Sequence, residues 1–217
     1  MSSRVLRTFA ATVMAGALAA SVASIGLGWR PSIATADPGD TFVALGSSQL
    51  IQSEDLSAIQ VTLDTATVTL NRDEDFSGCL GEGNPWTAVL PGAKKPFTAA
   101  WTSRKNKNVA LYESVAQAET PAQAKAYAKT LLDSGIRGCQ GSSSPWDFHY
   151  GKTSSSPVGS GTATWALSYR GSETRASGGA IVFSKGTNFG IIEVTGTWGP
   201  AGQTMESIAK VAVGRLN

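Results

Sequence analysis

One short pattern, C-x-G-x-x-x-P-W, occurs twice in the chain, at residues 79–86 and 139–146. Cys79 and Cys139 are the only cysteines, so a disulfide between them has a single possible connectivity. It would close a loop of about 60 residues and stabilise the fold by roughly 4 kcal/mol. We expect this disulfide to join two equivalent turns, each followed by a strand that begins at the tryptophan. Two free buried thiols and a chance repeat are the alternatives.

The first 36 residues have the composition of an export signal. Arg4 and Arg7 form a basic start, an uncharged apolar run covers residues 8–29, and Ala36 ends a small-residue cleavage site. We therefore expect cleavage before Asp37 and a secreted, extracellular protein, a location that favours disulfide formation. The alternative is a retained membrane anchor, because the apolar run is long enough to span a bilayer.

The leader also dominates the net charge. The whole chain carries 18 Lys and Arg residues against 16 Asp and Glu residues, a net charge of +2. Three of the arginines and none of the acids lie in residues 1–36, so the exported chain would be close to neutral. A neutral domain has no electrostatic drive toward nucleic acid or anionic lipid, and we expect neither as a partner.

Beyond the leader, we expect a linker over residues 37–46 and a single domain over residues 47–217. Hydrophobic periodicity predicts a helix start near Ser53, a helix from Pro121 that ends at Gly135, and a closing helix with Met205, Ile208, Ala209, Ala212 and Leu216 on one face. Strands are predicted at residues 65–70, 86–90, 97–104, 109–117, 146–150, 162–170, 180–183 and 189–197. Residues 153–161 are rich in Ser and Gly and predict a mobile loop. Runs of strands broken by single helices indicate an α+β fold with an antiparallel sheet.

The sequence offers little catalytic chemistry. His149 is the only histidine, which excludes a metal site built on imidazoles. Asp147 and His149 share one strand face and could suit acid–base work, but no nucleophile motif accompanies them. The S-x-x-K match at residues 207–210 lacks its partner motifs, and the acidic turn at residues 73–84 lacks the final Glu of a calcium loop. We therefore expect no enzyme, no cofactor and no metal.

Five residues form a candidate binding cleft. Trp146 and Tyr150 lie next to the predicted 153–161 loop and could stack on a sugar or an acyl chain. Asp147, His149 and Arg170 are their polar companions. The alternative is that the aromatic side chains belong to the core and the polar ones to a solvated surface.

The order of these features resembles the extracellular sensor domain of the mycobacterial serine/threonine kinase PknH and its secreted actinobacterial relatives. The matching features, over residues 48–217, are a helix start at Leu50–Ile59, Cys79, a strand ending in Tyr112-Glu113-Ser114-Val115, an Ala-rich helix followed by Cys139, an aromatic strand, two more strands and a closing helix. The resemblance implies a twisted antiparallel sheet flanked by helices, a long-range disulfide at Cys79 and Cys139, and a cleft for an unidentified ligand. The family's second disulfide has no counterpart, since Ala180 stands where a cysteine is expected.

These features favour a secreted, non-enzymatic ligand-binding or sensor-type domain of the bacterial cell envelope. Its partner would be an unknown small molecule or envelope component. The alternatives are an envelope interaction or structural protein that binds another protein through its sheet edge or residues 153–161, and an unrecognised hydrolase. A retained leader would tether the protein to the membrane in each case.

Overall fold

The computed structural model describes residues 45–61, 63, 65–70, 85–103, 108–141, 148–198 and 201–216, with the backbone alone for residues 65–70. All of them belong to one compact unit, Val43–Asn217. The predicted leader and most of the predicted linker lie outside these residues. No helix within the described ranges has the length and apolar composition needed to cross a membrane.

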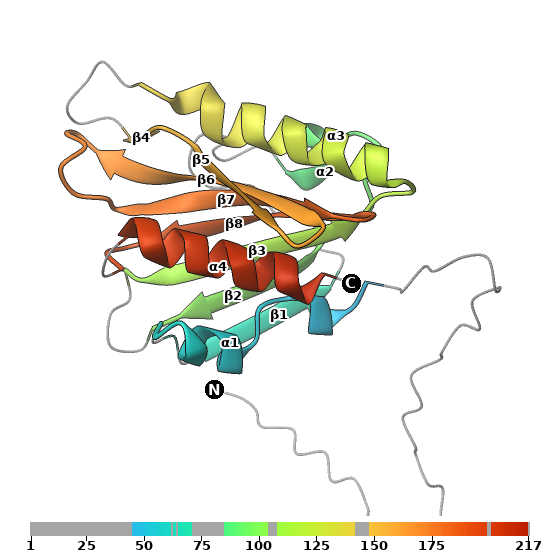
Figure 1. Cartoon of the computed structure of the whole chain (residues 1–217), viewed down its shortest axis with the longest axis horizontal. Helices are drawn as coiled ribbons and strands as arrows, with labels where there is room; N and C mark the ends of the chain where they lie inside the picture. The colour runs from blue at the N-terminus through green and yellow to red at the C-terminus, as the bar shows by residue number, and fades with distance from the viewer. Residues whose placement is uncertain are drawn as a thin grey trace, which may run out of the picture. The chain divides into compact units, whose positions relative to one another are not determined.

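The described elements form a single sheet with helices on both of its faces (Figure 1). In chain order they are η1 (Ser47–Gln49), α1 (Ser53–Ala58), β1 (Thr65–Leu70), α2 (Trp86–Val89), β2 (Phe97–Thr102), β3 (Ala110–Gln117), α3 (Pro121–Leu131), η2 (Leu132–Ile136), η3 (Arg137–Cys139), β4 (Phe148–Tyr150), β5 (Ser154–Val158), β6 (Gly161–Arg170), β7 (Gly178–Lys185), β8 (Asn188–Thr195) and α4 (Ala201–Arg215). The strand order is β1-β2-β3-β8-β7-β6-β4, with β5 also paired to β6, and every pair of strands is antiparallel. This confirms the predicted α+β class with helices flanking an antiparallel sheet.

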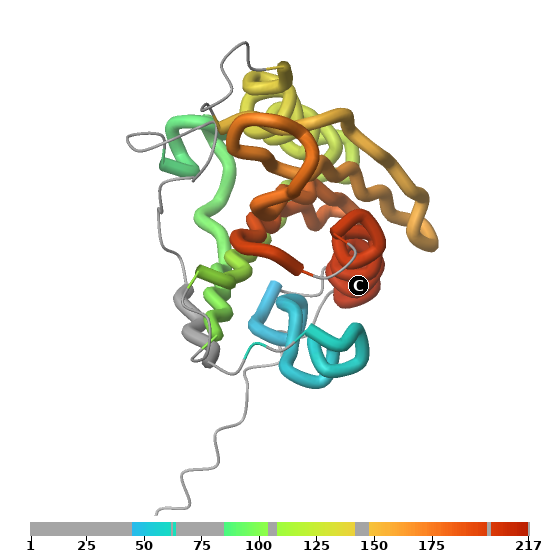
Figure 2. Tube along the Cα trace, turned by 90° about the vertical axis from the view of Figure 1, so that its left-hand side faces the viewer, coloured from blue at the N-terminus to red at the C-terminus, as the bar shows by residue number. Residues whose placement is uncertain are grey.

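One side of the sheet, called here the α4 face, packs against α4 and the N-terminal segment 45–61 (Figures 1 and 2). The predicted apolar face of α4 is confirmed, because all five of its residues are buried there: Met205, Ile208, Ala209, Ala212 and Leu216. Arg215, at the end of α4, donates to the Asp55 carboxylate of α1 from Nε at 2.7 Å. The first and last helices are thus joined directly.

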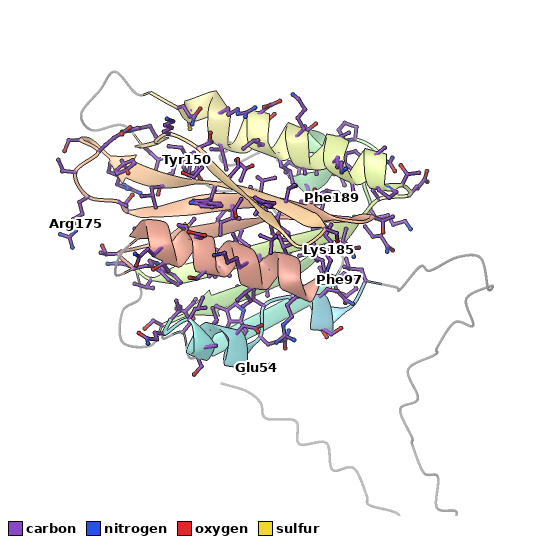
Figure 3. The ribbon with its side chains drawn as sticks, in the orientation of Figure 1. Glu54, Phe97, Tyr150, Arg175, Lys185 and Phe189 are labelled. Atoms are coloured by element: carbon purple, nitrogen blue, oxygen red, sulfur yellow. The ribbon has the colours of Figure 1, made fainter. Side chains whose placement is uncertain are left out.

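The opposite side, the α3 face, packs against α3 and α2. Helix α3 begins as predicted, with Pro121 at its first position and the Thr120 hydroxyl accepting from the Gln123 N–H at 3.1 Å. Trp86 of α2 stacks on Phe189 of β8, with ring centroids 5.6 Å apart. Phe189 is fully buried beside α3 (Figure 3). Aromatic packing therefore fixes both helices to the centre of the sheet.

The predicted strand at residues 86–90 is wrong, because Trp86–Val89 forms the single helical turn α2. Pro85 precedes it in extended conformation, and the Trp86 indole is buried and donates to the Lys94 carbonyl at 3.0 Å. Burying one large ring in this way outweighs the strand tendency of a short segment. The first copy of the repeated pattern thus leads into a helix, whereas Trp146 of the second copy lies outside the described residues.

The prediction that the helix from Pro121 ends at Gly135 is wrong. The chain continues through the π-helical turn η2 and the 3₁₀ turn η3 to Cys139. The wider turn carries Ile136 into the core, where it is fully buried. Burial of this side chain gives a physical reason for the extra winding.

The mobile loop predicted at residues 153–161 is wrong as well, because most of it is strand β5. It pairs with β6 from Ser154 opposite Trp165 to Val158 opposite Gly161. The connection is a two-residue turn in which Gly159 has a positive φ of 58°. Hydroxyls of Ser155 and Thr164 lie 3.0 Å apart across the pair. Serine-rich composition therefore serves cross-strand hydrogen bonding here.

Cys139 is half-buried at the end of η3, and none of the described cysteines is free. Its predicted partner, Cys79, lies outside the described residues. The pairing of these two cysteines stays a prediction.

Candidate functional site

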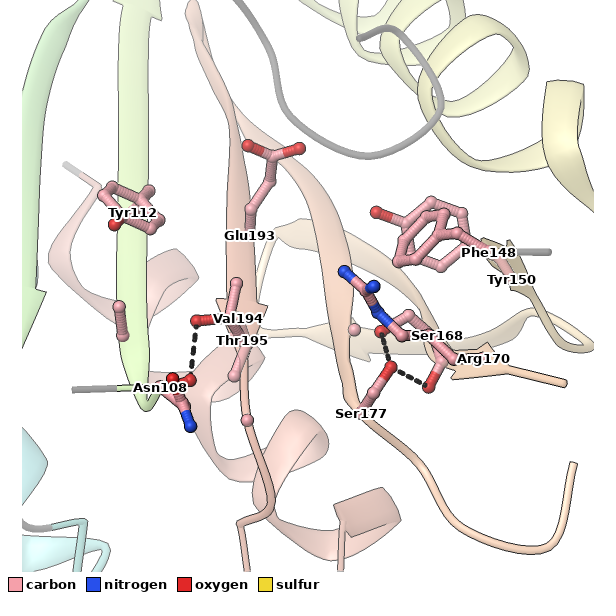
Figure 4. Close-up of a pocket in the computed structure, with 13 residues that line it drawn as sticks. Asn108, Tyr112, Phe148, Tyr150, Ser168, Arg170, Ser177, Glu193, Val194 and Thr195 are labelled. Carbon is pink, nitrogen blue, oxygen red and sulfur yellow. Dashed lines mark hydrogen bonds between the residues drawn. The ribbon is translucent and has the colours of Figure 1, made fainter. Parts of the chain in front are cut away.

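A pocket of about 700 Å³ opens on the α3 face, over the ends of β3, β8, β7, β6 and β4 (Figure 4). The register places five α3-face residues in one row across these strands: Ala110, Thr195, Gly178, Ser168 and Tyr150. Four of them are small, so the middle of the row leaves space above the backbone. Local sequence thus makes the hollow, because larger side chains at Ala110, Ser168 and Thr195, which line it, would fill it.

Three aromatic side chains form the walls of the pocket. Phe148 and Tyr150 project from the same face of β4 and meet edge to face, with centroids 5.3 Å apart and ring planes at 80°. Tyr112 lies across the pocket on β3 (Figure 4) and is 43% exposed, the one large hydrophobic side chain exposed among the described residues. The exposed ring of Tyr112 thus faces the half-buried ring of Phe148 and the almost fully buried ring of Tyr150.

The hydroxyl of Tyr150 is the most unusual polar group of the site. The side chain is only 3% exposed, yet its hydroxyl has no hydrogen-bond partner within the described part of the chain. Burial raises the pKa of Tyr150 far above its ordinary value, and the nearby negative charge of Glu193 raises it further. The hydroxyl therefore stays protonated at any physiological pH and can both donate and accept a hydrogen bond in the pocket.

Two opposite charges complete the lining. Arg170, at the end of β6, is exposed, and Glu193, on β8, is half-buried. Both charged groups point toward the space between Tyr112 and the rings of Phe148 and Tyr150 (Figure 4). The pocket therefore combines one cation and one anion with apolar walls.

Hydroxyl groups hold the lower rim in place. Ser177, before β7, donates to the Ser168 carbonyl at 3.3 Å, and the two serine hydroxyls lie 3.5 Å apart. The Thr195 hydroxyl donates to the Asn108 carbonyl at 3.3 Å (Figure 4). These bonds tie the loops at the ends of β3, β6 and β8 to the sheet, which fixes the shape of the opening.

Of the five residues of the predicted cleft, the structure brings Tyr150 and Arg170 together in this pocket. It places His149 on the α4 face, stacked on Tyr169 with centroids 5.7 Å apart and with Nε2 3.4 Å from a Glu173 carboxylate oxygen. Trp146 and Asp147 lie outside the described residues. Alternation along β4 separates His149 from Tyr150, because neighbouring residues of a strand point to opposite faces.

Sequence reasoning missed Tyr112, Phe148 and Glu193 as site residues. Tyr112 and Glu193 are direct partners in the β3–β8 ladder, and both face the same side of the sheet. The available signal was the pair of polar residues at alternate positions of each strand, Tyr112 and Ser114 on β3 and Glu193 and Thr195 on β8. That signal becomes a site only once the pairing of β3 with β8 is known.

Other chemical candidates lie apart from this pocket. The S-x-x-K match falls on α4, where the Lys210 ammonium pairs with Glu206 at 2.7 Å. The calcium-like turn, residues 73–84, lies outside the described residues. Across the described ranges, no group of three or more His, Cys, Asp or Glu side chains is placed to hold a metal ion.

A buried acid, Glu113, lies on the α4 face of β3. Its side chain is fully buried; Oε2 accepts from the Ile51 N–H at 2.7 Å, and Oε1 has no hydrogen-bond partner among the residues that the structure describes. Burial raises the pKa of Glu113 to about 8, and the negative charge of Asp55 also raises it. The hydrogen bond from Ile51 and the positive charge of Arg215 lower the pKa, but by less. The N-terminal segment is therefore held to the sheet by a carboxyl group that is largely protonated near neutral pH.

No family model matches the chain, and no curated protein does. Among solved structures, the crystal structure of the extracellular domain of PknH from Mycobacterium tuberculosis is similar, with a TM-score of 0.48 and 14% sequence identity. The match covers 76% of this chain and 93% of that one.

Proposed function

We propose that this protein is a secreted, non-enzymatic domain of the sensor type, which binds a small molecule of the cell envelope in the pocket on the α3 face. The observation that carries the proposal is a pocket of about 700 Å³ lined by the Tyr150 side chain, whose hydroxyl has no partner in the described structure.

The composition of the pocket supports the same function. Ligand sites are concave and mostly apolar, with a few polar groups that fix orientation, and their volumes fall in the range of about 300–1,000 Å³. Tyr112, Phe148 and Tyr150 supply the apolar surface, while Arg170 and Glu193 supply the orienting groups. The leader and the resemblance to PknH-type sensor domains, both read from the sequence, support an extracellular role.

A thermal-shift screen of the purified, oxidised protein tests this function. We would use four pools: short peptides, glycan fragments, envelope lipids and metal ions. A ligand that binds only the folded state raises the apparent melting temperature, and the rise grows with the logarithm of the ligand concentration once this exceeds the dissociation constant. We expect a dose-dependent rise with one pool.

Two variants of the loop before β7 localise the binding. Ser177→Trp introduces a large ring into the pocket lining, and we expect it to abolish the rise. Ser172→Trp places the same ring at an exposed position that does not line the pocket, and the rise should persist. Tyr112→Ala removes one wall and should weaken binding even if Ser177→Trp folds poorly. A rise that survives both pocket variants, or no rise with any pool, would contradict the proposal and favour a protein partner.

A further inference from the structure

One charged group of the pocket has no partner of its own. Arg170 and Glu193 are the charged residues of the described lining, and Glu193 already takes part in another interaction. The Arg170 guanidinium, in contrast, forms no hydrogen bond and no salt bridge within the described part of the chain. It points into the pocket from the end of β6 (Figure 4). Arg170 is therefore the group to which a ligand can add an opposite charge.

The strand register attaches the two charged residues at different ends of the pocket. Arg170 is opposite Phe148 of β4, whereas Glu193 is opposite Ala180 of β7, which is opposite Ala166 of β6. Four residues along β6 correspond to about 13 Å, and the two strand spacings between β6 and β8 add about 10 Å across the sheet. A ligand group can therefore bind next to Arg170 without lying beside the backbone of Glu193.

A second donor lies close to Arg170. Tyr150 is its diagonal neighbour across the β4–β6 ladder, a position that separates two residues by about 7–8 Å. Burial raises the pKa of Tyr150, so its hydroxyl keeps the proton and can donate it to an anion. A guanidinium can donate two parallel hydrogen bonds to a carboxylate. Both side chains can thus reach one carboxylate between them.

The lining discriminates among ligand classes. A neutral glycan would leave the Arg170 guanidinium without a partner, and a cation would be repelled by it. A phosphate monoester carries nearly two negative charges at neutral pH, and the charge of Glu193, which acts on Tyr150, opposes the second one. A carboxylate brings a single charge. The rings of Tyr112 and Phe148 supply apolar surface for the rest of such a ligand.

Resting on the proposed function, we propose that the ligand is a carboxylic acid with an apolar or aromatic body. Its carboxylate binds the Arg170 guanidinium and the Tyr150 hydroxyl, and its body packs against Phe148 and Tyr112. Neutral and cationic compounds with the same body bind less tightly.

Four compounds with one aromatic body test this assignment by calorimetric titration of the whole oxidised protein. The probes are naphthylacetate, naphthylacetamide, naphthylethylamine and naphthyl phosphate. Loss of the charged hydrogen bonds should make the amide bind roughly tenfold or more weakly than the acid. We expect the acid to bind most tightly and the ammonium compound most weakly. High salt should reduce the difference between acid and amide, because Arg170 is exposed.

Variants of the two donors assign the carboxylate. In Arg170→Gln the acid and the amide should bind equally, and an unchanged affinity for the amide would show that the pocket is intact. Arg170→Lys keeps the charge without the forked geometry and should keep part of the preference for the acid. Tyr150→Phe keeps the ring and should reduce the preference without abolishing it. Arg175→Gln, on the loop between β6 and β7 and outside the pocket lining (Figure 3), is the matched control and should keep the full preference.

The outcomes separate the ligand class from the function. Equal binding of acid and amide, tighter binding of the ammonium compound or the phosphate, or a preference for the acid that survives Arg170→Gln would overturn the carboxylate assignment. Absence of naphthylacetate binding would overturn it too. The proposed function would stand in each case if another ligand class bound in a way that Ser177→Trp abolishes. Failure of every probe and every pool to bind in that way would overturn both.

Discussion

Glu113 couples the stability of this domain to pH. Folding raises its pKa from an ordinary value of 4.5 to about 8, so between these values the folded state binds more protons than the unfolded state. The contribution to stability is complete below pH 4.5 and is lost as the pH rises toward 8. We expect the wild-type protein to lose on the order of a few kcal/mol across this window, and Glu113→Gln to show a flatter profile. Urea unfolding at intervals from about pH 5 to about pH 9 measures the difference.

A second carboxyl group serves as the control for that experiment. Hydrogen bonds from Lys129 and Arg137 lower the pKa of Asp133 below its ordinary value of 3.8, so it titrates outside the window. Asp133→Asn should therefore keep the wild-type slope between pH 5 and 9. A Glu113→Gln slope as steep as that of the wild type would show that another group governs the pH dependence.

Gly178, where β7 begins, is a backbone position that other residues fit poorly. Its φ is 142°, and an added Cβ would lie 1.9 Å from the Val194 carbonyl oxygen. We expect Gly178→Ala to lower the free energy of unfolding by more than about 2 kcal/mol, because strand β8 must move to relieve the clash. Chemical denaturation measures this loss.

The matched substitution is Gly202→Ala on α4, where an added Cβ meets nothing within 4 Å. Alanine is a better helix former than glycine, so this variant should be as stable as the wild type or more stable by up to about 1 kcal/mol. Equal effects of the two substitutions would show that the close approach at Gly178 carries no strain.

At the level of elements, the cap of α3 has a definite energetic role. Thr120→Ala removes the hydroxyl that accepts from the Gln123 N–H, and we expect it to cost about 1 kcal/mol of stability. Thr130→Ala on the same helix removes only a back-bond to the Ala126 carbonyl and should be neutral within about 0.5 kcal/mol. Equal melting temperatures for the two variants would contradict a stabilising cap.

Elements with long, regular patterns could be predicted from the sequence. The apolar spacing of α4 and the Thr120-Pro121 start of α3 depend on local interactions alone, and both are present in the structure. Strand β7 was also predicted, over residues 180–183, because a short unbroken apolar run is typical of a strand that is buried on both faces. Local chemistry was sufficient wherever one residue pattern had one favourable conformation.

The wrong predictions concern segments whose conformation depends on contacts with residues that are distant in the sequence. Trp86 begins the helical turn α2 because its ring stacks on Phe189 of β8. Residues 154–158 form a strand because β6 lies next to them. The pocket depends on the same kind of information, since Tyr112, Tyr150 and Glu193 meet only through the β3–β8–β7–β6–β4 pairing.

At the scale of the whole molecule, we expect a single long-range disulfide between Cys79 and Cys139. The protein purified under oxidising conditions should be two hydrogens lighter than its reduced form and should have no titratable thiol. Reduction should lower its stability by roughly 4 kcal/mol, because the unfolded chain regains the freedom of a large loop. A double variant with serine at both positions should be insensitive to reductant. Two titratable thiols in the unfolded oxidised protein would contradict the bond.

The β5–β6 hairpin has a consequence for how these molecules behave when they are crowded. No other described strand pairs with the outer side of β5. A bare strand edge can recruit the edge of a neighbouring molecule and so begin aggregation. Here the outer strand is short and contains Pro157, which has no N–H to donate. The β5–β6 hairpin is therefore a protected sheet edge. It disfavours strand pairing between two copies of this protein at that edge.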